Sequence, residues 1–286
     1  MQTILILLGP LRNRTSSTLI TILLWSAYLL ADWSPKFGVG LITESKRSAG
    51  DDVDGSGSGN NQLGALWAQF LLLHLGGSDT ITAFSLEDNQ LWLRQLFGVT
   101  AQAVAAGYIF FQMHPGGNSH LLIPSIFVFI AGAIKCFERI RAMNLASEKN
   151  VRDSIKKQFS VLERKNIEDK DPVQRADLIS KFFIGIIVDL FPIFNLDPYF
   201  QGSFKASLSF TPALALQIIE VELNFIYEFF HTKIKVVRAR LGMILRFTSF
   251  CSIVIALSVF YSQANSFNDA FDAGVTYTLF WATIAL

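Results

Sequence analysis

Residues 95–134 read QLFGVTAQAVAAGYIFFQMHPGGNSHLLIPSIFVFIAGAI and contain no Asp, Glu, Lys or Arg. A helix needs about 20 predominantly apolar residues to cross the roughly 30 Å hydrocarbon core of a bilayer. The sequence HPGGN at 114–118 divides the run with residues typical of a turn. The run therefore predicts a helical hairpin in a membrane, with arms over 91–113 and 121–137.

The bulk composition agrees with a membrane protein. Hydrophobic residues make up 51% of the chain and charged residues 16%, and the mean hydropathy is +0.39. A net charge of +1 lacks the basic excess with which a protein binds nucleic acid. Cys136 and Cys251 lie in apolar stretches without nearby Cys or His at metal-ligand spacing. We therefore expect no nucleic-acid partner, no disulfide framework and no cofactor.

Further apolar stretches predict more membrane helices. The stretches 15–33 and 242–261 are each built on a long uncharged run, so each predicts a span. The stretch 63–75 is shorter and ends at Gly76-Gly77. It predicts either a short span or a re-entrant helix.

The two ends of the chain carry incomplete apolar runs. Residues 4–8 are too few to cross a bilayer, and the run at 273–286 stops before it could complete a span. These runs suggest a chain truncated at both ends. We predict an all-α integral membrane protein with about five to six transmembrane or re-entrant helices and a helical cytoplasmic segment.

The distribution of Lys and Arg predicts the orientation, since cytoplasmic loops are rich in basic residues. Of the 24 basic residues, 16 lie between Glu138 and Arg240, and Arg12 and Arg14 precede the first predicted span. Both regions are predicted to be cytoplasmic, which requires the stretch 63–75 to cross. The predicted parts are N-terminal membrane helices over 1–137, a cytoplasmic helical segment over 138–240, and C-terminal membrane helices over 241–286, the last one truncated.

The central segment contains two amphipathic patterns. Val151, Ile155, Phe159 and Leu162 recur at helical spacing beside basic residues, which predicts a basic amphipathic helix. Such a helix either adheres to an anionic membrane surface or, the interpretation we favour, packs on another cytoplasmic helix. The stretch 206–231 is apolar but contains three glutamates, so we predict a surface or interfacial helix. Those glutamates, a secondary candidate site for a cation or for acid–base chemistry, are Glu220, Glu222 and Glu228.

The densest polar stretch, HLGGSDTITAFSLEDNQLWLRQ at 74–95, joins the stretch 63–75 to the hairpin. Gly76-Gly77 is suited to ending a helix in left-handed geometry, and Ser85 with Asp88 matches a capping box that starts the next helix. Ionisable groups near membrane depth are also functional candidates, able to hold a cation or gate a pathway. The candidate polar cluster comprises His74, Asp79, Thr80, Glu87, Asp88 and Arg94.

Four stretches carry a resemblance to a known family: RTSSTLITILLWSAYLLADW at 14–33, LWAQFLLLHLGGSDTITAFSLEDNQLWLRQ at 66–95, IKCFERIRAM at 134–143 and EVELNFIYEFFHTK at 220–233. In these stretches the chain resembles the plant membrane proteins grouped as "domain of unknown function 4220". The resemblance implies a plant multi-pass membrane protein without an established activity, so it transfers no catalytic residue. Longer members carry further spans and a separate C-terminal domain. Gln69 and Ser78 depart from the family pattern, which usually has proline there.

Three functions compete at this point. The leading hypothesis is a non-enzymatic membrane interaction or regulatory protein whose segment 138–240 binds a cytoplasmic protein partner, because the sequence contains no catalytic arrangement. The alternative is a transporter or channel component that uses the polar loop 74–94. The third is a membrane-embedded lipid-modifying enzyme that uses His74 and nearby carboxylates.

Overall fold

The computed structural model describes residues 2–12, 17–49, 58–113, 121–162, 172–188, 212–263 and 270–284. Every regular element in these ranges is an α-helix, and these ranges contain no strand. The predicted all-α class is therefore confirmed. The predicted turn at 114–118 lies outside the described residues.

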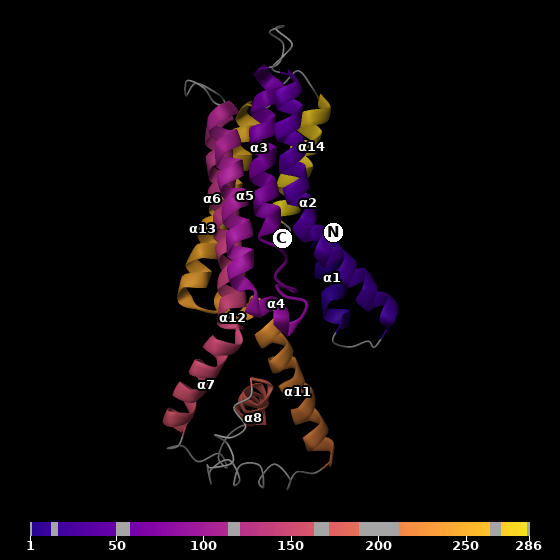
Figure 1. The fold of residues 1–286 in the computed structure, drawn as a ribbon, viewed down its shortest axis with the longest axis vertical. Helices are drawn as coiled ribbons and strands as arrows, with labels where there is room; N and C mark the ends of the chain where they lie inside the picture. The colour runs from indigo at the N-terminus through magenta and orange to yellow at the C-terminus, as the bar shows by residue number, and fades with distance from the viewer. Residues whose placement is uncertain are drawn as a thin grey trace.

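The helices form an elongated molecule with an upper bundle and a lower group (Figure 1). The bundle contains α1 (Gln2–Arg12), α2 (Thr18–Ala49), α3 (Ser58–Leu75), α5 (Trp92–Met113), α6 (Leu122–Leu145), α13 (Arg240–Gln263) and α14 (Ala270–Ile284). The lower group contains α7 (Glu148–Leu162), α8 (Pro172–Ile187) and α11 (Pro212–His231). The short helices α4 (Leu86–Gln90) and α12 (Ile234–Val237) lie where the two parts meet.

The bundle is organised around α6, which packs most extensively against α3 and α13. Its core contains Leu66 and Phe70 of α3, Val128 of α6, Phe260 of α13 and Phe280 of α14. Helices α3 and α6 approach closely at Gly132, where an added Cβ would lie 3.1 Å from the backbone N of Leu73. Small residues permit such backbone contact between helices, so α3 and α6 can pack closely at this point.

The long helices of the bundle alternate in direction (Figure 1). Helix α2 rises to the upper end, α3 descends from it, α5 rises again and α6 descends. Helix α3 ends part-way along α6, because Gly76 lies against Lys135, ten residues before α6 ends. The chain from Gly76 to Ser85 then continues down to α4.

Two helices extend beyond their predicted ends. Helix α2 does not stop near Trp33 but continues past Pro35 to Ala49. Helix α6 continues from the predicted limit at 137 to Leu145, because Glu138 and Arg139 are buried against neighbouring helices. The predicted boundary at 137/138 therefore falls inside a continuous helix.

The lower group buries the apolar stripe of α7. Val151 and Ile155 pack with Ile184 and Val188 of the α8 region and with Phe230 of α11. Packing on other helices thus accounts for Val151 and Ile155, whereas the side chains of Phe159 and Leu162 lie outside the described ones.

Among the described residues, α13 is the one helix long and apolar enough to cross a membrane by length and composition, with a mean hydropathy of 2.0 in its most apolar part. Gln2–Arg12 and Leu63–Leu75 are shorter apolar helical stretches. In α6, Lys135, Glu138 and Arg139 interrupt the apolar run.

Candidate functional site

The C-terminal end of α3 has the geometry that its glycines predict. Gly77 has a φ of +70°, in the left-handed region that an L side chain rarely adopts. The N–H of Gly76 donates to the Leu73 carbonyl at 3.1 Å, and the N–H of Gly77 donates to the His74 carbonyl at 3.1 Å. The helix therefore stops at Leu75, inside the protein.

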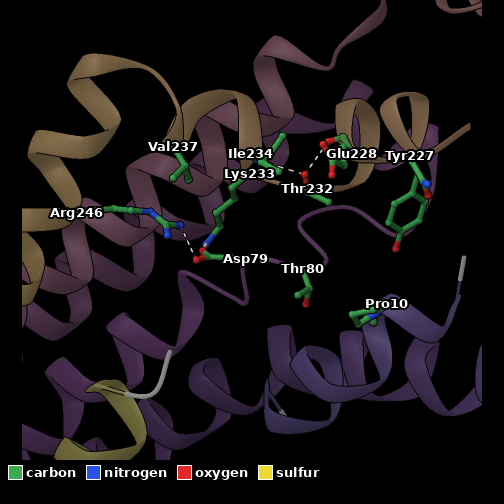
Figure 2. A pocket seen from close by; sticks show the side chains of 12 residues that line it. Pro10, Asp79, Thr80, Tyr227, Glu228, Thr232, Lys233, Ile234, Val237 and Arg246 are labelled. Atoms are coloured by element: carbon green, nitrogen blue, oxygen red, sulfur yellow. Dashed lines mark hydrogen bonds and ion pairs between the residues drawn. The ribbon is translucent and has the colours of Figure 1, made fainter. Parts of the chain in front are cut away.

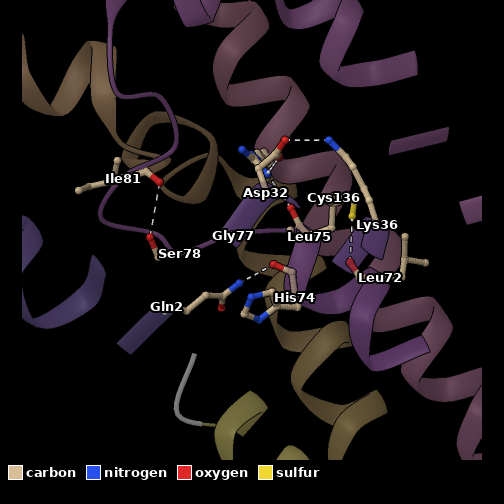
Figure 3. Close-up of polar contacts among 12 residues, drawn as sticks. Gln2, Asp32, Lys36, Leu72, His74, Leu75, Gly77, Ser78, Ile81 and Cys136 are labelled. Atoms are coloured by element: carbon tan, nitrogen blue, oxygen red, sulfur yellow. Dashed lines mark hydrogen bonds and ion pairs between the residues drawn. The ribbon is translucent and has the colours of Figure 1, made fainter. Parts of the chain in front are cut away.

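A helix that ends inside a protein leaves carbonyl groups that need donors. Arg139 Nη1 of α6 donates to the Leu75 carbonyl at 2.8 Å. Lys233 Nζ donates to the Gly76 carbonyl at 2.8 Å and to the Gly77 carbonyl at 3.0 Å. Gln2 of α1 donates to the His74 carbonyl (Figure 3). Side chains from three separate parts of the chain thus cap α3.

Carboxylates balance the capping cations. Asp32 of α2 accepts from Arg139 at 3.1 Å and pairs with Lys36 at 2.8 Å. Lys233 lies 3.5 Å from Asp79, whose other oxygen lies 2.5 Å from Arg246 Nη2 of α13 (Figure 2). A buried ion pair is held only when its charges are matched, because desolvation is costly.

Glu138 completes a group of four charges. Its side chain is fully buried, neither carboxylate oxygen has a hydrogen-bond partner, and Arg246 Nε lies 3.8 Å away. We call Asp79, Glu138, Lys233 and Arg246 the buried charge cluster. Its four members come from four parts of the chain. Asp79 lies in the loop after α3, Glu138 in α6, Lys233 at the start of α12 and Arg246 in α13.

Burial and neighbouring charges shift the pKa values in this cluster. Burial lowers the pKa of Lys233 to about 8, although Asp79 opposes that shift. Burial acts to raise the pKa of Asp79, but Lys233, Lys135 and Arg246 together hold that pKa below its ordinary value. Asp79 is therefore ionised near neutral pH, and Lys233 holds its proton less firmly than an exposed lysine does.

A cavity of about 400 Å³ lies beside the cluster. Figure 2 shows Asp79, Thr80, Lys233 and Arg246 around it, with Tyr227 on the side of α11. Its wall combines both signs of charge with hydroxyl and apolar groups. Such a lining can hold a small polar or amphipathic solute.

The structure brings together only half of the predicted polar cluster. His74, Asp79 and Thr80 lie at the end of α3, where Thr80 Oγ1 donates to the Leu5 carbonyl at 2.9 Å. Asp88 instead caps α4, since its Oδ2 accepts from the N–H of Ser85 at 3.1 Å. Ser85 and Asp88 form the predicted capping box.

The remaining predicted residues are not members of the buried charge cluster. Glu87 and Arg94 are exposed. On α11, Glu220 is exposed and Glu222 is buried, whereas Glu228 lines the cavity. The three glutamates therefore do not form one site.

Sequence reasoning missed most of the charges that meet at α3. Asp32, Glu138, Arg139 and Lys233 were not among the candidates, although each lies in one of the four stretches that carry the family resemblance. Those stretches meet in space at the end of α3. Charged residues inside these otherwise apolar stretches were the feature of the sequence that could have indicated the site. Arg246, in the predicted span 242–261, had no such signal beyond its charge.

The comparisons with known proteins identify a family. Neither a curated protein nor a solved structure matches the chain. The model of the family described as "Domain of unknown function (DUF4220)" matches residues 25–286, which include the whole buried charge cluster. The chain therefore belongs to the family of the domain of unknown function 4220.

Proposed function

We propose that this protein is a multi-pass plant membrane protein without catalytic activity, which holds α7, α8 and α11 at the cytoplasmic membrane surface to bind a protein partner. The proposal rests on the exterior of the bundle. Phe97 and Phe111 of α5 and Phe247 of α13 are each more than 70% exposed. Exposed apolar surface on this scale favours contact with lipid.

The alternation of helix direction supports several crossings. Helices α2, α3, α5 and α6 run up, down, up and down (Figure 1). If the bundle lies across a bilayer, the stretch 63–75 crosses it rather than returning to the same side. The basic segment 138–240 and Arg12 then share one side, as the positive-inside rule requires.

Cysteine labelling tests this orientation. Cys136 and Cys251 are replaced by Ser, and single reporters are introduced as Glu44→Cys, Gln112→Cys or Lys149→Cys. In sealed vesicles with the non-cytoplasmic side outward, a membrane-impermeant maleimide is expected to label the first two, at the upper end, and to label the third only after permeabilisation. Labelling of Glu44→Cys and Lys149→Cys from the same side would remove the multi-pass proposal.

An exposed apolar stripe on α11 supports the partner. Leu216, Ile219 and Leu223 recur along one face, and Leu216 is 69% exposed. All three side chains remain exposed among the described residues. An amphipathic helix of this kind commonly packs its apolar side chains into a groove of another protein.

Affinity purification of the full chain from native membranes tests the partner. The variant Ile219→Glu/Leu223→Glu is expected to lose proteins that the wild type retains, because charge is excluded from an apolar interface. The exposed control Lys149→Glu is expected to keep them. An identical set of proteins with wild type and stripe variant would contradict the proposal.

A second candidate function is solute or ion transport. The observation that favours it is the cavity beside the buried charge cluster. In proteoliposomes that contain the full chain, Asp79→Asn is expected to reduce flux and Glu87→Gln, an exposed control on α4, is expected to leave it unchanged. Flux equal to that of empty liposomes would exclude this function.

A further inference from the structure

A second cavity lies in the lower group, below the foot of the bundle. Its volume is about 460 Å³, and its walls come from α7, α8, α11 and α12 and from the chain before α13. Ile155, Ile184 and Phe225 give it an apolar wall. Its polar residues are Lys181, Lys235 and Arg238, the hydroxyls Ser154 and Ser180, and the carboxylates Asp177 and Glu228.

The cations of this cavity are incompletely neutralised. Asp177 Oδ2 forms an ion pair with Lys181 Nζ at 2.6 Å. Among the described residues, no carboxylate lies within ion-pair distance of Lys235 or Arg238. Lys235 Nζ instead lies 3.1 Å from the centre of the Phe229 ring. Among the described residues, Lys235 and Arg238 therefore face the cavity without an ion-pair partner.

Burial and a neighbouring cation both disfavour the charged form of Lys235. Burial lowers that pKa to about 8, and the neighbouring charge of Lys181 lowers it further, while Asp177 opposes the shift. An anion bound between Lys235 and Arg238 would offset both effects. A dianion would do so most strongly, because Coulomb attraction grows with charge.

The position of the cavity suggests the source of the anion. Arg238 lies two residues before α13, the helix apolar enough to cross a membrane. Basic pockets beside membrane helices on the cytoplasmic side are suited to phosphorylated lipid headgroups. The hydroxyl of Ser154 adds a donor for phosphate oxygens.

We propose that this cavity binds a phosphate monoester through Lys235 and Arg238, presented by a phosphorylated lipid headgroup or by free phosphate. The lipid as source rests on the membrane orientation proposed above, whereas the site does not depend on the protein partner, since the exposed stripe of α11 is not part of its lining. Failure of the partner experiment therefore leaves this proposal standing.

Binding to the full chain, purified in neutral detergent, tests the proposal. The probes are dioctanoyl phosphatidylinositol 4-phosphate, dioctanoyl phosphatidylinositol, inorganic phosphate and a poly-glutamate peptide. The phosphorylated lipid is expected to bind at least about tenfold more tightly than phosphatidylinositol, since it adds charge-assisted hydrogen bonds. Complete competition by millimolar inorganic phosphate identifies free phosphate as sufficient, and weaker competition identifies the lipid headgroup as the source.

A matched pair of variants locates the site. Lys235→Gln/Arg238→Gln is expected to weaken binding of the phosphorylated lipid at least about tenfold. Lys149→Gln/Lys156→Gln removes the same charge from exposed positions of α7 and is expected to leave binding unchanged. Unfolding temperature and gel filtration establish whether both variants fold. The comparison of probes on the wild type does not require either variant.

Three results would overturn the proposal. The first is equal binding of the two lipids by the wild type. The second is an equal loss of binding in both double variants, which would indicate general attraction to charge. The third is tighter binding of poly-glutamate than of the phosphorylated lipid, which would assign the cavity to an acidic peptide.

Discussion

Lys233 is the residue on which the end of α3 depends. Its side chain is fully buried, and its ammonium donates to two carbonyls and faces Asp79. No water can replace these contacts at a position without exposure. The residue therefore links α12 to α3 by hydrogen bonds as well as by charge.

Replacing Lys233 is expected to destabilise the protein strongly. Lys233→Met leaves two buried carbonyls without a donor and removes one of the two cations beside Asp79, at a cost of about 3–5 kcal/mol in the free energy of unfolding. Thermal unfolding in detergent measures the change. Lys149→Met, at an exposed position, is the control. Adding Asp79→Asn should recover part of the loss, and a Lys233→Met variant as stable as the control would contradict the assignment.

Glu222 predicts a pH dependence. It is 5% exposed, and burial raises its pKa from 4.5 to about 7. The folded state then holds the proton longer than the unfolded state, so stability falls as pH rises from about 4.5 to about 7 and stays lowered above that. At pH 8, Glu222→Gln is expected to be more stable by about 1–3 kcal/mol.

Unfolding temperatures from pH 4.5 to pH 8 check the Glu222 prediction. Glu222→Gln should flatten the profile relative to the wild type. Glu220→Gln, at an exposed position of the same helix, should retain the wild-type slope. Parallel profiles for wild type and Glu222→Gln would show that this group does not control the pH dependence.

At the scale of elements, the contact between α3 and α6 depends on two glycines. A Cβ at Gly76 would lie 2.6 Å from Lys135 Cβ, and a Cβ at Gly132 would lie 3.1 Å from Leu73 N. Both positions therefore need a residue without a side chain. The polar caps on α3 follow from this packing, because it places the helix end beside Arg139.

Alanine substitutions test this contact. Gly76→Ala is expected to lower the free energy of unfolding by about 1–3 kcal/mol, since the neighbouring backbone must move. Gly107→Ala on α5 meets no atom within 4 Å and should be neutral or slightly stabilising, as alanine favours a helix. The unfolding temperatures of the two variants give the comparison. An equal effect at both positions would indicate that the close approach is unimportant.

For the molecule as a whole, the proposed membrane position of the bundle predicts how substitutions in α13 affect its insertion into the bilayer. Ile255 lies near the middle of α13, 41% exposed, and Tyr261 lies near its end, 73% exposed. Asp at the centre of a membrane helix costs about 2.5–3.5 kcal/mol, and the cost falls toward the ends. Ile255→Asp is therefore expected to reduce insertion more than Tyr261→Asp.

A glycosylation reporter placed after α13 measures the inserted fraction. The wild type and Tyr261→Asp should give similar fractions, and Ile255→Asp a clearly smaller one. Equal insertion of all three chains would mean that α13 is held by protein contacts rather than by hydrocarbon. The membrane proposal would then lose its most apolar helix.

Much of the helical framework was predictable because it follows from local pattern. The uncharged run at 95–134 predicted the positions of α5 and α6, and Gly76-Gly77 predicted the end of α3. The capping box at Ser85 and Asp88 was equally local. Each of these features depends on residues within a few positions of one another in the chain.

The extent of α2 and α6 was not predictable in this way. The predicted ends at 33 and 137 followed the limits of the apolar runs, since charged residues are rare inside a membrane helix. In the folded chain α2 continues past Pro35, and α6 continues because its charges are buried against other helices. Burial of that kind is a property of the neighbours, which the sequence does not reveal.

Local patterns along the chain are enough to predict the all-α class, the family and the residues that end and start the helices around the loop 76–85. The fold is needed to see that four charged residues meet, because up to 167 positions separate Asp79, Glu138, Lys233 and Arg246 in the chain. The physical reason is that α3 ends inside the bundle, and its free carbonyls require donors that only distant segments supply.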